Sequence, residues 1–370
     1  MRLGKGAKHL SFCMNIFPGE SLEALTQVIS NECVQIKSQI CPDEDFGLGL
    51  RLSAESAAEL RDLTKLKALK DLLTERGLYA FTVNAFPFGN FHVAPVKEKV
   101  YFPDWSSSER LKYTCDVAEA LAYLLPEDSV LGSISTVPVT FGKVLPSGAI
   151  DNLRQCAQYL ADLECRTGKH IELALEPEPD CYLETCDETI DFFELLSDQI
   201  DAALMTYLGV CVDTCHGALQ FEDATESLQT YIDAEINISK IQLSSAIILD
   251  HEKPGDEALM FPFEEKVYLH QTRVMNAKNE VKAFKDLPEA LKASTKGEWR
   301  THFHVPLHFE GEGKLRSTFK LIDQSFFDLA LQYCDHIETE TYTYLVLPEP
   351  RQEITACIVD ELVLAKSLLS

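Results

Sequence analysis

The sequence predicts an α/β fold in which eight parallel strands close into a (β/α)8 TIM barrel. Three observations predict it. Short apolar runs alternate with amphipathic helical patterns along almost all of the 370 residues, and most of the apolar runs have one bulky face and one small or polar face. No linker or internal repeat divides the chain. Alternating strands and helices indicate βαβ units, so we expect one domain over residues 1–370.

Nine strand-like runs follow one another along the chain: LSFCMNIF, FGLGLRLS, LYAFTVNAF, GSISTVPVTF, HIELALEPEP, YLGVCVDTCH, KIQLSS, HFHVPL and HIETETYT. A barrel of this class has eight strand positions, so one run is in excess. We therefore expect an insertion or accessory hairpin at about residues 248–298.

Two helices have clear sequence signals. One helix is predicted over residues 54–76, with Ser53 as its N-cap and Gly77 just past its end. The other follows Ser106 and Glu109, which have the spacing of a capping box. Each helix lies between two strand-like runs, as a parallel barrel requires.

The run HIELALEPEP shows why a barrel is favoured over an open sheet. Its residues Ile171, Leu173 and Leu175 point one way, and Glu172 and Glu176 point the other. Parallel strands are usually covered on both faces, so this polar face is not a solvent-exposed surface. In a barrel the apolar side packs on the outer helices and the polar side faces the axis. A doubly wound sheet would also favour a glycine-rich phosphate loop, and GLGLR lacks the required spacing.

Composition limits the possible functions. Lys and Arg total 33 against 59 Asp and Glu, a formal net charge of -26, so nucleic acid is not an expected partner. We expect no direct membrane insertion, because no apolar run reaches about 20 residues. The 12 cysteines show no CxxC pair, and the N-terminus lacks the pattern of a secretory signal, so reduced thiols and a cytoplasmic location are expected. Oligomeric state is left open.

The active site of a TIM barrel lies at the carboxyl ends of its strands. The polar residues at or just after these ends are Asn15, Asn84, Ser135, Glu176, Asp213, His216, Gln242, His304 and Glu340. Three carboxylates among them would repel one another in a barrel mouth unless a cation or protons neutralise them. With carboxylate, amide and imidazole donors, Mn²⁺, Mg²⁺, Co²⁺ and Zn²⁺ all fit. We predict that Glu176, Asp213 and Glu340 meet there and bind a divalent metal.

Other polar residues have structural interpretations. Glu172 and Glu338 lie deeper along their strands, and Arg51 or Lys240 is the expected ion-pair partner. Glu178 follows a proline, so a solvated or capping position is expected for it. The loops FPFGNFH and YFPDW follow the third strand and place aromatic side chains on the functional side, either as substrate contacts or as loop packing: Phe86, Phe88, His92, Phe102 and Trp105.

Four motifs at the predicted strand ends resemble those of a known group of proteins. LEPEPD, VDTCH, KIQLSS and ETYT look like successive strand ends of the xylose-isomerase-like TIM barrels, which include sugar isomerases, sugar epimerases and endonuclease IV. The whole chain also resembles the EboE family, the TIM-barrel proteins of the ebo metabolite-traffic gene cluster. That second resemblance rests on HLSFCMNIFPGES, FTVNAFPFGNFH, YFPDW, GSISTVP, YLHQ, HFHVPL and ETYTYLVLP.

The superfamily pattern implies roles for individual residues. Glu176, Asp213 and Glu340 match its metal carboxylates, and His216 matches the histidine near the substrate or a second metal. The usual histidine ligand falls on Gln242, a poorer ligand for zinc. Either His304 or His302 then supplies the nitrogen ligand, or metal binds more weakly. Asn15, Asn84 and Ser135, together with Phe86, His92, Trp105 and His302 from the loops, are the expected substrate contacts.

The resemblance implies a metal-dependent isomerase or epimerase of a small oxygenated metabolite, in which Glu176, Glu340 and His216 are catalytic. Two alternatives stay open. One is a metal-dependent hydrolase of a small phosphoester, and the other is a non-catalytic metabolite binder or carrier partner. The ebo association adds metabolite traffic as the setting of the isomerase or epimerase, and it also supports the second alternative.

Overall fold

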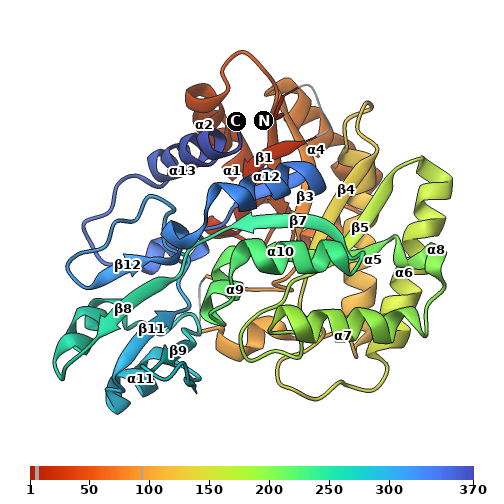
Figure 1. The fold of residues 1–370 in the computed structure, drawn as a ribbon. Helices are drawn as coiled ribbons and strands as arrows, with labels where there is room; N and C mark the ends of the chain where they lie inside the picture. Colours follow the sequence, from red (N-terminus) through yellow and green to blue (C-terminus); the bar gives the residue numbers. More distant parts are fainter. Residues whose placement is uncertain (5–7, 93–94) are drawn as a thin grey trace.

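The computed structural model describes residues 1–4, 8–92 and 95–370, and its core is an eight-stranded parallel barrel (Figure 1). Its strand order is β1-β13-β7-β6-β5-β4-β3-β2. The strands are β1 (His9–Phe12), β2 (Phe46–Arg51), β3 (Leu78–Asn84), β4 (Leu131–Thr136), β5 (His170–Leu175), β6 (Leu208–Asp213), β7 (Asn237–Leu243) and β13 (His336–Thr339). The predicted TIM barrel is confirmed.

The barrel closes between β1 and β2 with few hydrogen bonds. Cys13 forms a single parallel bridge with Gly49, and Ser11 Oγ donates to Gly47 O at 2.6 Å. Gly49 is required here because a Cβ at this position would lie 1.1 Å from Glu338 Oε1. Gly49 therefore makes room for the buried Glu338 carboxylate.

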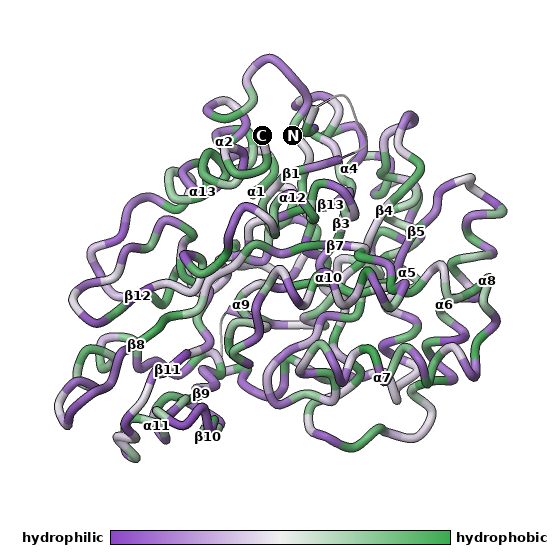
Figure 2. Tube along the Cα trace, in the orientation of Figure 1, coloured by the Kyte–Doolittle hydropathy of each residue, from purple (hydrophilic) through white to green (hydrophobic). Residues whose placement is uncertain are grey.

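Helices cover the outside of the barrel. They are α1 (Leu22–Val28), α2 (Val34–Ile40), α3 (Ala54–Glu59), α4 (Leu63–Glu75), α5 (Ser108–Leu124), α6 (Ala149–Thr167), α7 (Cys186–Ser197), α8 (Ala202–Met205), α9 (Thr214–Leu219), α10 (Ala224–Asp233), α12 (Gln324–Tyr333) and α13 (Ile354–Leu368). Hydrophobic and hydrophilic residues alternate along many of them (Figure 2). Their apolar sides join the outward side chains of the strands, such as Leu48, Leu173 and Ile241, in one core.

Two predicted helix details are wrong. The helix predicted over 54–76 is two helices, because the Asp62 carboxylate accepts from Thr64 N and starts α4 after a break. The N-cap of α5 is Ser107 rather than Ser106, and its hydroxyl accepts from Glu109 N at 3.1 Å. Ser53 does cap the first of the two helices.

Of the nine strand-like runs, HFHVPL is the one that is not a barrel strand. The residues of HFHVPL, 302–307, belong to no strand and lie in the connection between two strands of the accessory sheet. That sheet is antiparallel, with order β10-β9-β11-β8-β12, and lies beside the barrel (Figure 1). Its strands are β8 (Ile247–His251), β9 (Thr272–Met275), β10 (Val281–Phe284), β11 (Gly297–Thr301) and β12 (Leu315–Ser317), with helix α11 at Leu287–Ala293. The accessory segment is thus longer than the predicted 248–298.

Short 3-10 and π segments complete the connections. They are η1 (Met14–Ile16), η2 (Ile29–Cys33), η3 (Lys97–Tyr101), η4 (Asp256–Phe263), η5 (Thr318–Leu321) and η6 (Tyr342–Val346). Two of them, η1 and η6, follow barrel strands directly and help to form the barrel mouth. Within the described residues, no helix combines the length and apolarity needed to cross a membrane.

Candidate metal centre

Three carboxylates from three strands meet at the barrel mouth. Glu176 follows β5, Asp213 ends β6 and Glu340 follows β13. Each residue is at most 4% exposed, and one oxygen from each lies within 4.8 Å of the others. The structure therefore brings together the three residues that the sequence selected for a metal.

Three amides hold Glu340. Its Oε1 accepts from Asn15 Nδ2 at 2.7 Å, from Gln242 Nε2 at 3.0 Å and from Asn84 Nδ2 at 3.3 Å. The amide oxygen of Gln242 accepts from the Cys211 thiol at 3.2 Å. The predicted role of Gln242 as a metal ligand does not fit this geometry, because its nitrogen faces the cluster and its oxygen faces away.

The other two carboxylates keep one oxygen unbonded. Asp213 Oδ1 accepts from Ser244 Oγ at 2.6 Å and from the backbone N–H groups of Cys215 and His216, which caps α9. Asp213 Oδ2 and Glu176 Oε2 are buried without a hydrogen-bond partner among the described residues. Buried polar atoms are rarely left unsatisfied, so these two oxygens fit a cation.

The electrostatics of the cluster agree with this fit. Burial raises the pKa of Glu176 and of Glu340 well above the usual range, and the neighbouring carboxylates raise both further. Burial alone would also raise the pKa of Asp213, but His216, His304 and the Ser244 hydroxyl lower it below its usual value. The close approach of three carboxyl groups favours their protonated forms, and a bound divalent cation would take the place of those protons.

His216 adds a nitrogen beside the carboxylates. Its Nδ1 donates to Pro177 O at 2.9 Å, so in the neutral ring the lone pair is on Nε2. That Nε2 is buried and has no partner among the described residues. The arrangement gives the site an imidazole lone pair next to three carboxylates.

His302 and His304 lie on the accessory side of the same mouth. His304 Nδ1 is 3.2 Å from Glu340 O and 3.4 Å from Glu340 Oε2, while His302 Nδ1 is 2.8 Å from Gln271 Oε1. One ligand atom of His304 also lies within 4.8 Å of ligand atoms of Asp213 and His216. Of the two histidines proposed as substitutes for a ligand at Gln242, His304 is the one next to the carboxylates.

A small cavity of about 40 Å³ lies over the carboxylates. This volume has room for an ion and very few waters, and it is much smaller than a typical ligand pocket of about 300–1,000 Å³. The lining includes Asn15, Asn84, Phe86, Phe91, Tyr101, Glu176, Glu178, His216, Tyr268, Glu340 and Tyr342. A larger cavity of about 340 Å³ is lined by Asp213 and by residues of α9 and α10. The smaller cavity is the candidate site because Glu340, His216 and Glu176, with its unbonded Oε2, all line it.

The predicted substrate contacts divide into two groups. Asn15, Asn84 and Phe86 line the cavity. His92 lies just behind it, with Nε2 2.7 Å from Asn15 O and Nδ1 2.6 Å from Tyr268 OH.

Three other aromatic positions lie away from the cavity. Trp105 is fully buried in the core, because its backbone N–H bonds to Val139 O and draws the loop against β4. Phe88 packs edge-on against Tyr113, and Phe102 is 50% exposed. Loop packing, rather than contact with the cavity, accounts for these three residues.

Two polar predictions also differ from their expected positions. Ser135 lies inside the barrel one layer below the carboxylates, 3.5 Å from Lys240 Nζ. His302 is turned toward Gln271 and His304 and does not line the cavity. Neither residue lines the cavity, although a ligand atom of His302 lies within 4.8 Å of ligand atoms of Glu178 and His216, which do.

Sequence reasoning missed one acidic residue of the mouth. Glu178 was expected in solvent but is 6% exposed and accepts from Tyr101 OH at 2.8 Å. Burial raises its pKa to about 7. The prolines on both sides of it, Pro177 and Pro179, were the available signal, since they restrict the backbone that points it inward.

Known structures share this architecture. The chain is similar to a xylose isomerase-like TIM barrel protein from Mycobacterium smegmatis in complex with magnesium, at 11% identity, 99% and 98% coverage of the two chains and a TM-score of 0.55. It is also similar to a D-allulose 3-epimerase from Methylomonas sp., at 13% identity, full coverage of both chains and a TM-score of 0.50. An IolI protein with a bound zinc atom matches at 12% identity, 98% coverage of each chain and a TM-score of 0.49.

The first two likenesses show that this chain has the TIM-barrel fold of those proteins. At such low identity they say nothing about its substrate or reaction. No protein-family model matches the chain, and no curated protein matches it by sequence.

Proposed function

We propose that this protein is a metal-dependent isomerase or epimerase acting on a small oxygenated metabolite. One observation carries the proposal: three buried carboxylates converge from three barrel strands, and two of them present unbonded oxygens. Like charges gathered in a dry site cost stability, so a function has to account for them. Solved structures of the same fold include an epimerase and a magnesium complex, which is consistent with the proposal.

Each polar residue has a task in this proposal. Glu176, Asp213 and Glu340 would hold the divalent cation, which when bound would polarise neighbouring substrate oxygens. Asn15, Asn84 and Gln242 fix the orientation of Glu340. Glu176 and Glu340 are the groups to take a proton from a substrate carbon and return it, because both line the cavity beside the cation that they would hold. His216 Nε2 is placed to accept a hydrogen bond from a substrate hydroxyl.

The charge around the cavity favours an uncharged substrate over a phosphoester. Among the described residues that line it, Lys97 is the one cation, and its Nζ is ion-paired with Asp286 Oδ2 at 2.5 Å. The formal net charge of -26 adds to this, so nucleic acid is a poor candidate. We therefore place a small neutral polyol or carbonyl compound ahead of the phosphoester alternative.

The second candidate is a non-catalytic metabolite-binding protein or carrier partner. The observation in its favour is Gln242, which stands where the superfamily usually has a histidine ligand and whose nitrogen faces the cluster. The resemblance to the ebo-cluster family supports metabolite traffic as its setting. Twelve free cysteines fit the cytoplasmic location that we propose for either candidate.

One experiment separates these possibilities. The protein is purified without chelator, its metal content is measured, and it is then incubated with neutral ketoses and cyclitols in D2O. An isomerase or epimerase incorporates deuterium at a carbon of its substrate, and Glu176→Gln abolishes the incorporation. Bound ligand without deuterium exchange would favour the carrier, and release of phosphate from a phosphoester panel would favour the hydrolase.

A further inference from the structure

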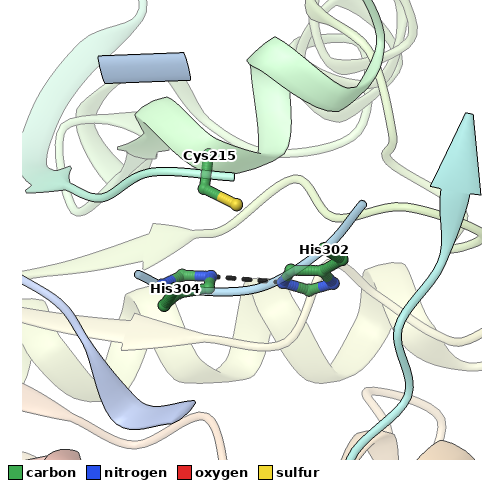
Figure 3. Close-up of side chains that lie close together, drawn as sticks. All are labelled: Cys215, His302 and His304. Atoms are coloured by element: carbon green, nitrogen blue, oxygen red, sulfur yellow. Dashed lines mark hydrogen bonds between the residues drawn. The ribbon is translucent and has the colours of Figure 1, made fainter. Parts of the chain in front are cut away.

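A second group of metal-ligating side chains lies beside the carboxylates without including any of them. Figure 3 shows Cys215, at the start of α9, above His302 and His304 of the connection between β11 and β12. The three residues are at most 1% exposed, and one ligand atom from each lies within 4.8 Å of the others. Backbone bonds fix the connection, because His302 N donates to Gln271 O at 2.8 Å and Val305 N donates to Ser245 O at 2.9 Å.

The hydrogen bonds of His302 determine which of its nitrogens carries the proton. Gln271 Nε2 donates to the carbonyl oxygen of Pro179 at 3.1 Å, which can only accept. The Gln271 amide oxygen therefore faces His302, 2.8 Å from Nδ1, and that Nδ1 must be the donor. The neutral His302 ring then has its lone pair on Nε2.

His304 has the same arrangement. Its Nδ1 is 3.2 Å from the carbonyl oxygen of Glu340, so Nδ1 carries the proton and Nε2 carries the lone pair. The two Nε2 atoms, of His302 and His304, are 3.2 Å apart (Figure 3). The Tyr342 hydroxyl lies 3.4 Å from His302 Nε2 and has one proton to donate, so it can satisfy only one of them. Two facing lone pairs at this distance require a proton or a cation between them.

The separation of the two nitrogens matches shared coordination. Two imidazole nitrogens bound to one tetrahedral zinc at about 2.05 Å lie about 3.3 Å apart. The observed separation is 3.2 Å. The Cys215 thiol donates to Phe303 O at 3.5 Å, and after loss of that proton its sulfur would be a third ligand. Three protein ligands with one open position are the pattern of a catalytic zinc site.

We propose that Cys215, His302 and His304 bind a borderline-soft divalent cation, with Zn²⁺ as the best fit, at a site separate from the carboxylate cluster. Thiolate and imidazole donors select zinc or cobalt, while carboxylates suit magnesium and manganese. The mouth would then hold two cations of different character. This inference uses none of the three carboxylates, so it stands or falls independently of the proposed function.

Cobalt provides the test, because thiolate bound to Co²⁺ gives a charge-transfer band in the near ultraviolet. The full-length protein is stripped with chelator and titrated with Co²⁺, alongside Cys215→Ser, His302→Gln and Glu176→Gln. The band is expected in the parent and in Glu176→Gln, it should vanish in Cys215→Ser, and His302→Gln should weaken binding at least tenfold. Zn²⁺ should displace the band in the parent.

Cys334→Ser is the matched control, since Cys334 is a buried cysteine near the opposite end of the barrel whose thiol bonds to His336 O. It should leave the band unchanged. Absence of the band in the parent would overturn the site whether or not any variant folds, and would mean that the two histidines share a proton. A band that persists in Cys215→Ser would also overturn it, because the sulfur would then come from another cysteine.

Discussion

The two ends of the barrel interior handle buried charge in opposite ways. Below the mouth, Lys240 Nζ pairs with Glu338 Oε2 at 2.6 Å, and both side chains are fully buried. At the lower end, His9 Nδ1 bonds to Tyr79 OH and His336 Nδ1 to Ser133 Oγ, each at 2.8 Å. At the mouth, three carboxylates face one another, and two of them keep an unbonded oxygen.

The comparison separates polar residues that stabilise the barrel from those that serve another purpose. In the lower layer Glu338 faces a cation, Lys240, and His9 and His336 each have a hydrogen-bonding neighbour, although Glu338 Oε1 is itself buried without a hydrogen-bond partner among the described residues. The mouth combines like charges and unbonded atoms, an arrangement that lowers stability when no cation is bound. Substitutions in the two layers should therefore change stability in opposite directions.

The largest effect is expected from breaking the lower ion pair. Lys240→Met leaves Glu338 without its cation and removes positive charge from below the carboxylates, which should cost about 3–5 kcal/mol of unfolding free energy. Urea unfolding monitored by circular dichroism measures the change. The double variant Lys240→Met with Glu338→Gln is the control, and it should recover most of the loss. Equal destabilisation of the single and double variants would mean that packing, not charge pairing, accounts for the effect.

A substitution at the barrel mouth is expected to raise the unfolding free energy rather than lower it. Glu176→Gln removes one of three crowded carboxylates and should raise the unfolding free energy of the metal-free protein by ~1 kcal/mol. The same change removes a metal ligand. A saturating divalent cation, which at 100 times its Kd stabilises the parent by about 2.7 kcal/mol, should then stabilise the variant far less. Thermal unfolding with and without Mn²⁺ checks both statements, and a variant stabilised by Mn²⁺ as much as the parent would refute the metal assignment.

A smaller effect is expected from the residues that orient Glu340. Gln242→Leu deletes one of three amide donors to Glu340 Oε1 and should weaken divalent-cation binding about 10–100-fold, as loss of a ligand's hydrogen-bond partner typically does. Isothermal titration with Mn²⁺ measures the affinity. Ser133→Ala, deeper in the barrel, is the control and should leave it unchanged. An unchanged affinity in Gln242→Leu would show that Asn15 and Asn84 suffice to orient the carboxylate.

The sequence predicted the part of this picture that depends on periodicity. Alternation along each strand placed Glu176, Asp213 and Glu340 at strand ends, and a closed barrel brings such ends together. Lys240 was one of two cations expected to pair with Glu338, and the structure shows that Lys240 does so while Arg51 pairs with Glu20.

What the sequence could not show depends on contacts between distant segments. Tyr268 comes from the accessory segment and reaches His92 across 176 residues, a contact that no local pattern encodes. HFHVPL alternates like a strand but belongs to no strand, so its two histidines lie between Cys215 and the carboxylates of the mouth rather than on a barrel strand. The direction of the Gln242 amide likewise depends on the Cys211 thiol beside it.

The smallest expected effect lies at the lower rim, in the pH dependence of stability. Hydrogen bonding to Glu172, opposed by burial and supported by Glu164, raises the pKa of His170 to about 9. Because this pKa lies above the unfolded value of about 6.5, the stabilisation is complete below pH ~6.5 and is lost as pH rises through about 9. His170 Nδ1 is 2.7 Å from Glu164 Oε2, and both side chains are partly exposed, so solvent screening should limit the contribution to less than ~1 kcal/mol.

Replacing the histidine tests this contribution. His170→Gln should flatten the difference in unfolding free energy between pH 6 and pH 9, and should leave Mn²⁺ affinity at the mouth unchanged because the substitution lies at the far end of β5. Urea unfolding at a series of pH values, compared with the parent, measures the slope. If the variant retains the slope of the parent, the titrating group is another residue, and the lower rim contributes no pH-dependent stability through His170.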